Sequence, residues 1–88
     1  MSDGASGATG VRAVVEMMAK ALADRPDDVR VTESQHKQVT LIEVFVAPAD
    51  VAKVLGRQGR TIAALRTLAS TAGEREGKAV TVEIREGR

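Results

Sequence analysis

Two glycines three residues apart, flanked by arginines, form the segment of this chain best suited to chemistry. It reads Gly56-Arg57-Gln58-Gly59 and is followed by Arg60. Glycines at this spacing allow a tight turn with positive φ and remove side chains that would keep a ligand away from the backbone. Such a turn points backbone N–H groups outward beside the start of a helix, where an anion is stabilised. The pattern therefore predicts a phosphate-binding loop, although the spacing alone also suits a plain corner between two helices.

The charge of the chain is concentrated around this loop. Thirteen Lys and Arg side chains against 12 Asp and Glu give the 88 residues a formal charge of only +1. Residues 51–73 contain Lys53, Arg57, Arg60, Arg66 and no acidic residue, which is +4, and the remaining 9 basic and 12 acidic residues give −3. This distribution excludes a broad basic coat and predicts a small positive site. Lys53 and Arg66 are also compatible with an ordinary solvated surface.

Helices must position the loop on both sides. Apolar residues at helical spacing predict one helix from residue 11 to 22, stopped by Pro26, and another over residues 62–72 after the loop. Gly73 is the expected C-terminal cap of that later helix. A helix of about two turns opens at Pro48 and ends at Gly56, directly before the loop.

Three strands complete the pattern. Alternating or continuous β-branched residues predict strands over 29–32, 39–46 and 80–85, and the polar residues 34–38 predict the turn of a hairpin. The order is α-β-β-α-α-β, typical of a two-layer α+β sandwich in which three helices cover a three-stranded mixed sheet. We expect one domain over residues 11–88, preceded by a flexible Gly/Ser/Ala-rich tail over residues 1–10.

Composition excludes several classes of function. The chain has no Cys, Trp or Tyr and a single Phe, which excludes disulfides, thiolate metal sites and the stacking of bases on aromatic rings. The lone His36 lies in a polar turn without partners for a triad or a metal, and no Walker lysine follows the glycines. We therefore expect no enzyme activity, no metal and no cofactor. No apolar run approaches the roughly 20 residues of a membrane span and no signal peptide is visible, so a cytoplasmic protein is expected.

The segment Val54-Leu55-Gly56-Arg57-Gln58-Gly59-Arg60 resembles the (V/I)-(I/L)-G-(K/R)-x-G core of KH domains. The element order is similar to the type II, prokaryotic KH arrangement. The chain also resembles the small single-domain bacterial KH proteins of the KhpA type, in segments 27–33, 46–48, 53–60, 62, 65–67, 76–78 and 82–84. Ala52 departs from the glycine of many relatives, and the tail is an extension.

The resemblance implies an RNA-binding protein that clamps about four single-stranded nucleotides along the GxxG loop. Phosphates would face the loop and bases an aliphatic groove, with Ile42 and Val44 beneath it. The implied RNA-binding residues are Lys53, Val54, Leu55, Gly56, Arg57, Gln58, Gly59, Arg60, Ile62 and Arg66. The resemblance further implies an RNA chaperone or post-transcriptional regulator linked to cell elongation and division, with self-association and a larger KH-containing partner of the Jag family.

A different class of function stays open beside RNA binding. Alternation in the central strand places Val39, Leu41, Glu43 and Phe45 on the face away from Val44 and Val46. An exposed apolar patch on that face would suit a homodimer or a partner interface. The alternative is therefore a protein-interaction or dimerisation module that docks a larger RNA-binding partner and has little RNA affinity of its own.

Overall fold

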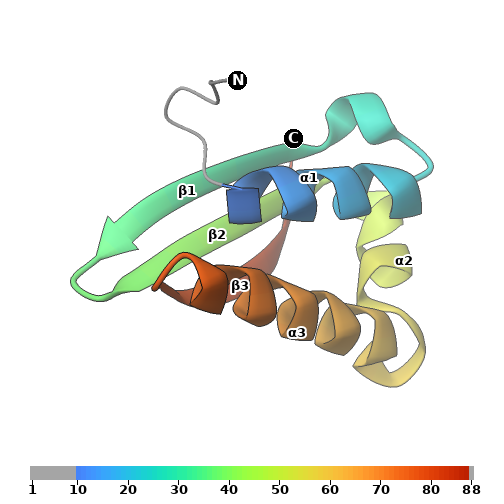
Figure 1. The fold of residues 1–88 in the computed structure, drawn as a ribbon. Helices are drawn as coiled ribbons and strands as arrows, with labels where there is room; N and C mark the ends of the chain where they lie inside the picture. The colour runs from blue at the N-terminus through green and yellow to red at the C-terminus, as the bar shows by residue number, and fades with distance from the viewer. Residues whose placement is uncertain (1–9, 88) are drawn as a thin grey trace.

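A computed structural model describes residues 10–87, and the tail expected at residues 1–10 lies outside this range except for Gly10. The predicted order α-β-β-α-α-β is confirmed (Figure 1). Its helices and strands are α1 (Gly10–Leu22), β1 (Arg30–His36), β2 (Val39–Val46), α2 (Val51–Leu55), α3 (Arg60–Arg75) and β3 (Ala79–Glu86). Short 3-10 turns lie at Pro26–Asp28, Pro48–Asp50 and Arg57–Gly59.

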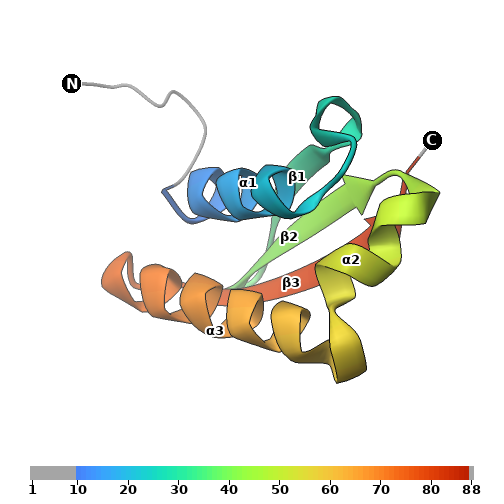
Figure 2. The same ribbon diagram turned by 90° about the vertical axis from the view of Figure 1, so that its right-hand side faces the viewer.

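The sheet has the order β1-β2-β3 with β2 in the centre, antiparallel to β1 and parallel to β3. The parallel pair is possible because α2 and α3 carry the chain back across the sheet between β2 and β3. All three helices pack on one face of this mixed sheet (Figures 1 and 2). The architecture is the two-layer α+β sandwich of a type II KH domain, as predicted.

The core is aliphatic and lies between the helices and the sheet. Side chains of β2 alternate between fully buried and half-buried positions, because one face of the strand meets the helices and the other does not. The buried residues that form the core are Val11, Val15, Ala19, Val29, Ile42, Val44, Val46, Val54, Ile62, Leu65, Ala69 and Val82. Removing their apolar surface from water, at about 25 cal/mol per Å², is the main force that holds α2 and α3 against the sheet.

One element end agrees with the prediction and another differs from it. Helix α1 ends at Leu22, as predicted, because the following proline ring disfavours helical backbone at Arg25, which has φ −118° and ψ 74°. Strand β1 continues through His36, so only Lys37 and Gln38 form the hairpin turn instead of residues 34–38. A two-residue turn suits the twist of paired strands, and Lys37 adopts the positive φ of 59° that such a turn requires.

The prediction that Gly73 caps the later helix is wrong, because α3 runs on to Arg75 and Gly77 takes the left-handed position with φ 70°. The N–H groups of Gly77 and Lys78 donate to the carbonyls of Glu74 and Gly73 at 3.1 and 2.8 Å, which is a Schellman motif. Gly73 instead lies buried against β3, where a Cβ atom would come within 2.5 Å of Val80 Cγ2. Gly73 therefore allows close packing of α3 on β3.

The sheet face away from the helices carries the residues expected there, but charged side chains partly cover them. Phe45 is half-buried, and the guanidinium of Arg30 on β1 lies 5.7 Å from the centre of its ring. On β3, Arg85 Nε donates to Glu43 Oε2 at 2.6 Å. Only Leu41 and Val39 add further apolar surface from β2, so charged side chains break the patch into small pieces.

Candidate nucleic-acid interface

The turn between α2 and α3 is built on Gly56. Its backbone has φ 78° and ψ 169°, a conformation open essentially to glycine alone. A Cβ atom there would lie 2.2 Å from Thr61 Oγ1 and 2.8 Å from the Thr61 backbone nitrogen. The first glycine of the loop therefore lets α3 start directly against the end of α2.

The remaining loop residues form a tight turn that leads directly into the start of α3. Gln58 and Gly59 both adopt left-handed backbone, with φ 58° and 74°. Two internal bonds close the turn: the Gly59 N–H donates to the Gly56 carbonyl at 3.0 Å, and the Arg60 N–H donates to the Arg57 carbonyl. No side chain caps the start of the 16-residue α3, so the positive end of its dipole is open to an anion. This geometry is that of a phosphate cradle, as the glycine spacing predicts.

The predicted cations around this cradle differ in whether their side chains are already paired with another residue. Arg57 is exposed and forms no ion pair with any residue in the described range, so its charge is available to a ligand. Arg60 Nη2 donates to Gln58 Oε1 at 3.1 Å, which keeps both side chains beside the loop. Lys53 Nζ lies 3.3 Å from Asp24 Oδ2, and this exposed pair partly offsets the charge of Lys53. The loop arginines are therefore better placed for a phosphate than Lys53.

Of the predicted apolar residues, most belong to the core. Val54 and Ile62 are 0% and 6% exposed, and Ile42 and Val44 beneath them are fully buried. Leu55 is half-buried at the end of α2. Val54 and Ile62 consequently hold the loop in place, and Leu55 is the member of this set that a base could touch.

Arg66 lies nearly two turns beyond the loop, on the side of α3 that faces β3. Its Nε donates to the Val82 carbonyl at 3.1 Å. β3 pairs only with β2, so this bond falls on the open edge of the strand. Arg66 therefore bridges α3 and β3, and its guanidinium lies along the seam between them.

Sequence reasoning missed three residues that shape the site. Thr61 occupies the space that a side chain at residue 56 would need, and Asp24 pairs with Lys53. Asp50 is 1% exposed and accepts the backbone N–H of Arg25 at 2.9 Å, instead of capping its own helix. The only sequence signal for any of them is the position of Asp50 after Pro48, which is also typical of an ordinary first-turn carboxylate.

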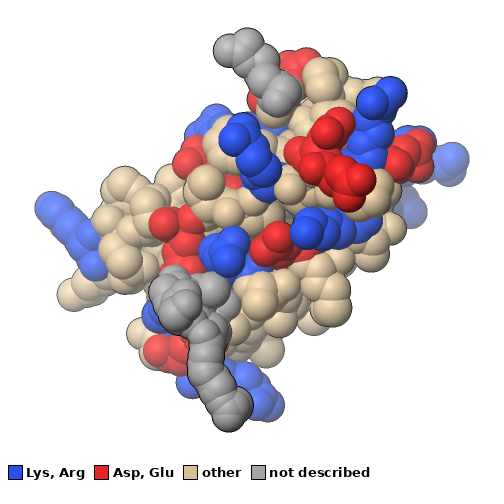
Figure 3. Space-filling model, turned by 90° about the horizontal axis from the view of Figure 1, so that it is seen from above, with Lys and Arg blue, Asp and Glu red and all other residues tan. Residues whose placement is uncertain are grey.

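The rest of the surface does not share the positive character of the loop. Acidic and basic side chains are interspersed over the face of the molecule that Figure 3 shows. On α1, Glu16 pairs with both Arg12 and Lys20, at 3.4 and 3.1 Å. Within residues 10–87, no group of three or more His, Asp or Glu side chains is placed to hold a metal ion. None of the helices described is long and apolar enough to cross a membrane.

Comparisons with known proteins agree with this geometry. A family model described as KhpA/KhpB, KH domain, matches residues 12–84. A protein named RNA-binding protein KhpA from Aquifex aeolicus is 44% identical over 78 residues, covering 89% of this chain and 99% of that protein. Proteins of the same name from Caldanaerobacter subterraneus and Clostridium perfringens are 49% and 42% identical, over 81% and 84% of this chain and 95% and 99% of their own lengths.

Proposed function

This chain belongs to the KhpA/KhpB KH-domain family, and on that premise we propose that it binds single-stranded RNA through the loop Gly56–Arg60 without catalysing a reaction. The observation that carries the proposal is the uncapped start of α3 beside two positive-φ residues and the unpaired Arg57, among the residues described. Its relatives named as RNA-binding proteins support RNA as the ligand.

The phosphates of the strand are the part of RNA that this loop suits. Backbone N–H groups and a helix dipole stabilise negative charge within about one helical turn of the helix start. Arg57 and Arg60 add charge-assisted hydrogen bonds to phosphate oxygens. A KH loop clamps the backbone of about four nucleotides, so we expect a short footprint and modest affinity.

The bases would lie along α3 and the edge of β3, where the described residues carry no aromatic ring. Leu55 supplies apolar surface beside the loop, and Arg66 lies further along the seam. Val54, Ile62, Ile42 and Val44 support this surface from below. Sequence preference must therefore come from aliphatic contact and hydrogen bonding to base edges.

The double variant Arg57→Asp/Gln58→Asp tests the proposal. Two carboxylates beside the phosphate should weaken binding to a short mixed-sequence RNA by about tenfold or more, given the worth of hydrogen bonds to charged groups. The salt dependence should also become less steep, by about one in the slope of log affinity on log salt. Fluorescence anisotropy at several salt concentrations measures both quantities.

The β1–β2 turn provides a matched control. Lys37→Asp/Gln38→Asp makes the same change of charge in an exposed turn, and Lys37 and Gln58 have left-handed φ values of 59° and 58°. This turn lies at the end of the hairpin, far from the loop between α2 and α3 (Figures 1 and 2). The control should bind RNA nearly as tightly as the unmodified chain. Equal losses in the two variants would point to general electrostatics and would refute the site.

The same titration decides between RNA binding and a pure interaction module. No affinity of the unmodified chain for RNA at physiological salt would favour the module that docks a larger KH-containing partner. The family resemblance also implies properties that stay predictions here. They are a role as an RNA chaperone, a link to cell elongation and division, a homodimer, a partner of the Jag family and a cytoplasmic location.

A further inference from the structure

A second feature lies on the same seam as Arg66 but at the opposite end of α3 from the loop. It is an open pocket of about 490 Å³ between the last turns of α3 and the start of β3. Its lining residues are Ser70, Glu74, Gly77, Lys78, Ala79 and Val80. The volume is within the range of pockets that hold a small organic group, and a single nucleobase fits inside it.

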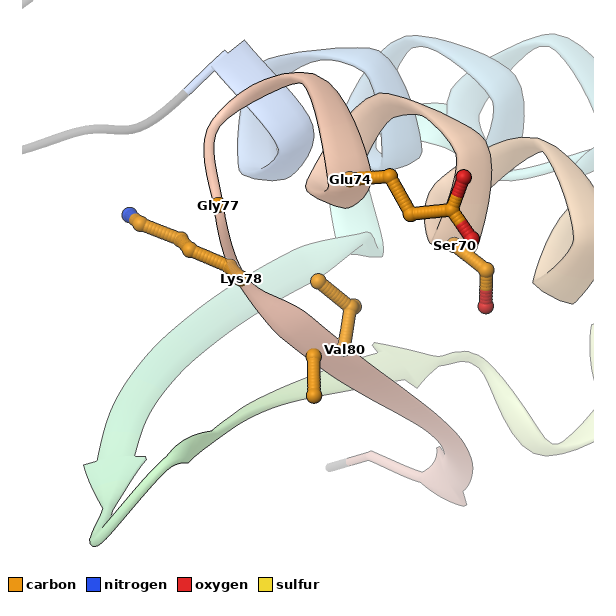
Figure 4. A pocket seen from close by; sticks show the side chains of 6 residues that line it. Ser70, Glu74, Gly77, Lys78 and Val80 are labelled. Atoms are coloured by element: carbon orange, nitrogen blue, oxygen red, sulfur yellow. The ribbon is translucent and has the colours of Figure 1, made fainter.

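Two polar side chains of the pocket, those of Ser70 and Glu74, are free to bind a ligand. Ser70 and Glu74 come from α3, and the Glu74 side chain extends toward that of Ser70 (Figure 4). Neither side chain has a hydrogen bond or ion pair with any other residue in the described part of the chain. Lys78 points away from them and lies 3.8 to 3.9 Å from the carboxylates of Glu76 and Glu33. The pocket thus has an apolar floor and one uncompensated carboxylate.

The spacing places this pocket within reach of an RNA strand held at the loop. Eleven residues of α3 separate Gly59 from Ser70, about 17 Å at the rise of an α-helix. That distance is about five nucleotides of a stacked strand at 3.4 Å each, and fewer in an extended one. Arg66 lies between the loop and the pocket, where its guanidinium would contact the phosphates of the RNA backbone. A strand following α3 would therefore bring a base at most about five positions from the loop to this pocket.

A carboxylate accepts hydrogen bonds and donates none, and its two oxygens can receive two parallel donors. Guanine is the base whose Watson–Crick edge carries two adjacent donors, N1–H and the exocyclic N2 amino group. Its neighbouring O6 can accept from the Ser70 hydroxyl. We propose that this pocket binds one guanine of the RNA and that Glu74 selects it through N1–H and the N2 amino group. The inference rests on the proposed RNA binding and adds a base preference to it.

Inosine in place of guanosine tests the assignment, because inosine lacks the N2 amino group and keeps N1–H and O6. The probes are short uridine RNAs with one guanosine, or one inosine, at successive positions. We expect the unmodified chain to favour guanosine by roughly fivefold, the lower end of the discrimination by a bidentate pair, because the pocket is open to water. The variant Glu74→Ala should bind both RNAs alike, and alanine is well tolerated in a helix.

Two controls separate this inference from its premise. The exposed Glu86 lies at the other end of β3, so Glu86→Ala should keep the guanosine preference. An RNA with 7-deazaguanosine, altered only at N7, should bind as tightly as guanosine. If the chain binds RNA through the loop but does not distinguish guanosine from inosine, or if Glu74→Ala keeps the distinction, the pocket assignment is wrong and the proposed function stands. No RNA binding by the unmodified chain would overturn both.

Discussion

Gly56 shows how a single residue decides the shape of the loop. Its φ of 78° suits glycine, and the backbone of Thr61 fills the space beside its Cα. Gly59 shares the positive φ, but a Cβ atom there would meet only Ile62 Cγ2, at 3.9 Å. Glycine is therefore required at the two positions for different physical reasons. The first glycine allows a close approach of two helices, and the second allows only a turn.

This difference predicts different costs for alanine at the two positions. Gly59→Ala should lower the free energy of unfolding by about 1–2 kcal/mol, the cost of left-handed backbone for a residue with a Cβ. Gly56→Ala should cost more than the 1–3 kcal/mol of backbone strain, because Thr61 must also move. Urea unfolding of both variants measures the two values, and equal losses would show that the contact with Thr61 has no effect.

The residue types of the loop could be predicted from the sequence, but their partners could not. Glycine spacing and nearby arginines are local patterns, and Gly56, Arg57, Gly59 and Arg60 do meet in one turn. Asp24 and Lys53 are 29 residues apart, and only the fold brings their side chains to 3.3 Å. Val54 is a similar case. Its apolar side chain is evident from the sequence, but only the structure shows that it is wholly buried.

At the scale of elements, a buried carboxylate joins the segment after α1 to the start of α2. Asp50 is 1% exposed and its Oδ2 accepts the N–H of Arg25 at 2.9 Å. A buried polar group requires such a partner, because leaving one unpaired costs about 1–3 kcal/mol. The bond therefore helps to fix α2, and with it the loop, relative to α1.

We expect Asp50→Ala to lower the free energy of unfolding by about 1–3 kcal/mol, since it leaves the Arg25 N–H without its acceptor. Asp50→Asn keeps a carbonyl oxygen of similar position and should cost less. Asp27→Ala, an exposed acidic residue in the turn Pro26–Asp28, is the control and should change stability by less than about 0.5 kcal/mol. Thermal and urea unfolding test the order of the three, and a wild-type stability for Asp50→Ala would contradict this role.

The existence and order of the elements followed from periodicity, and the errors lie at their ends. Residues 34–36 are polar and were predicted as turn, but they pair with residues 39–41 of β2 and extend the hairpin. Gly73 was predicted as a cap because glycine often ends helices, whereas Gly77 provides that end. Both cases depend on pairing and packing between distant segments, which local propensity does not contain.

At the scale of the whole molecule, positively charged side chains and the uncapped positive end of a helix dipole meet at one end of α3. The chain carries only +1 in total, and its acidic residues lie outside residues 51–73. Such an arrangement favours one small site over adhesion along the whole surface. On the opposite sheet face, Arg30 covers Phe45 and Arg85 pairs with Glu43. The homodimer interface expected on that face stays a prediction.

Mapping RNA contacts on the backbone amides by NMR tests the central claim most directly, because it needs no substitution in the site. A short single-stranded RNA is titrated into the labelled chain, and the shift of each amide is followed. We expect the largest shifts on Gly56–Ile62, with smaller shifts along α3 and none on Lys37 and Gln38 in the hairpin turn. Shifts centred on Arg30, Phe45 and Arg85 of the open sheet face, with none in the loop, would contradict it.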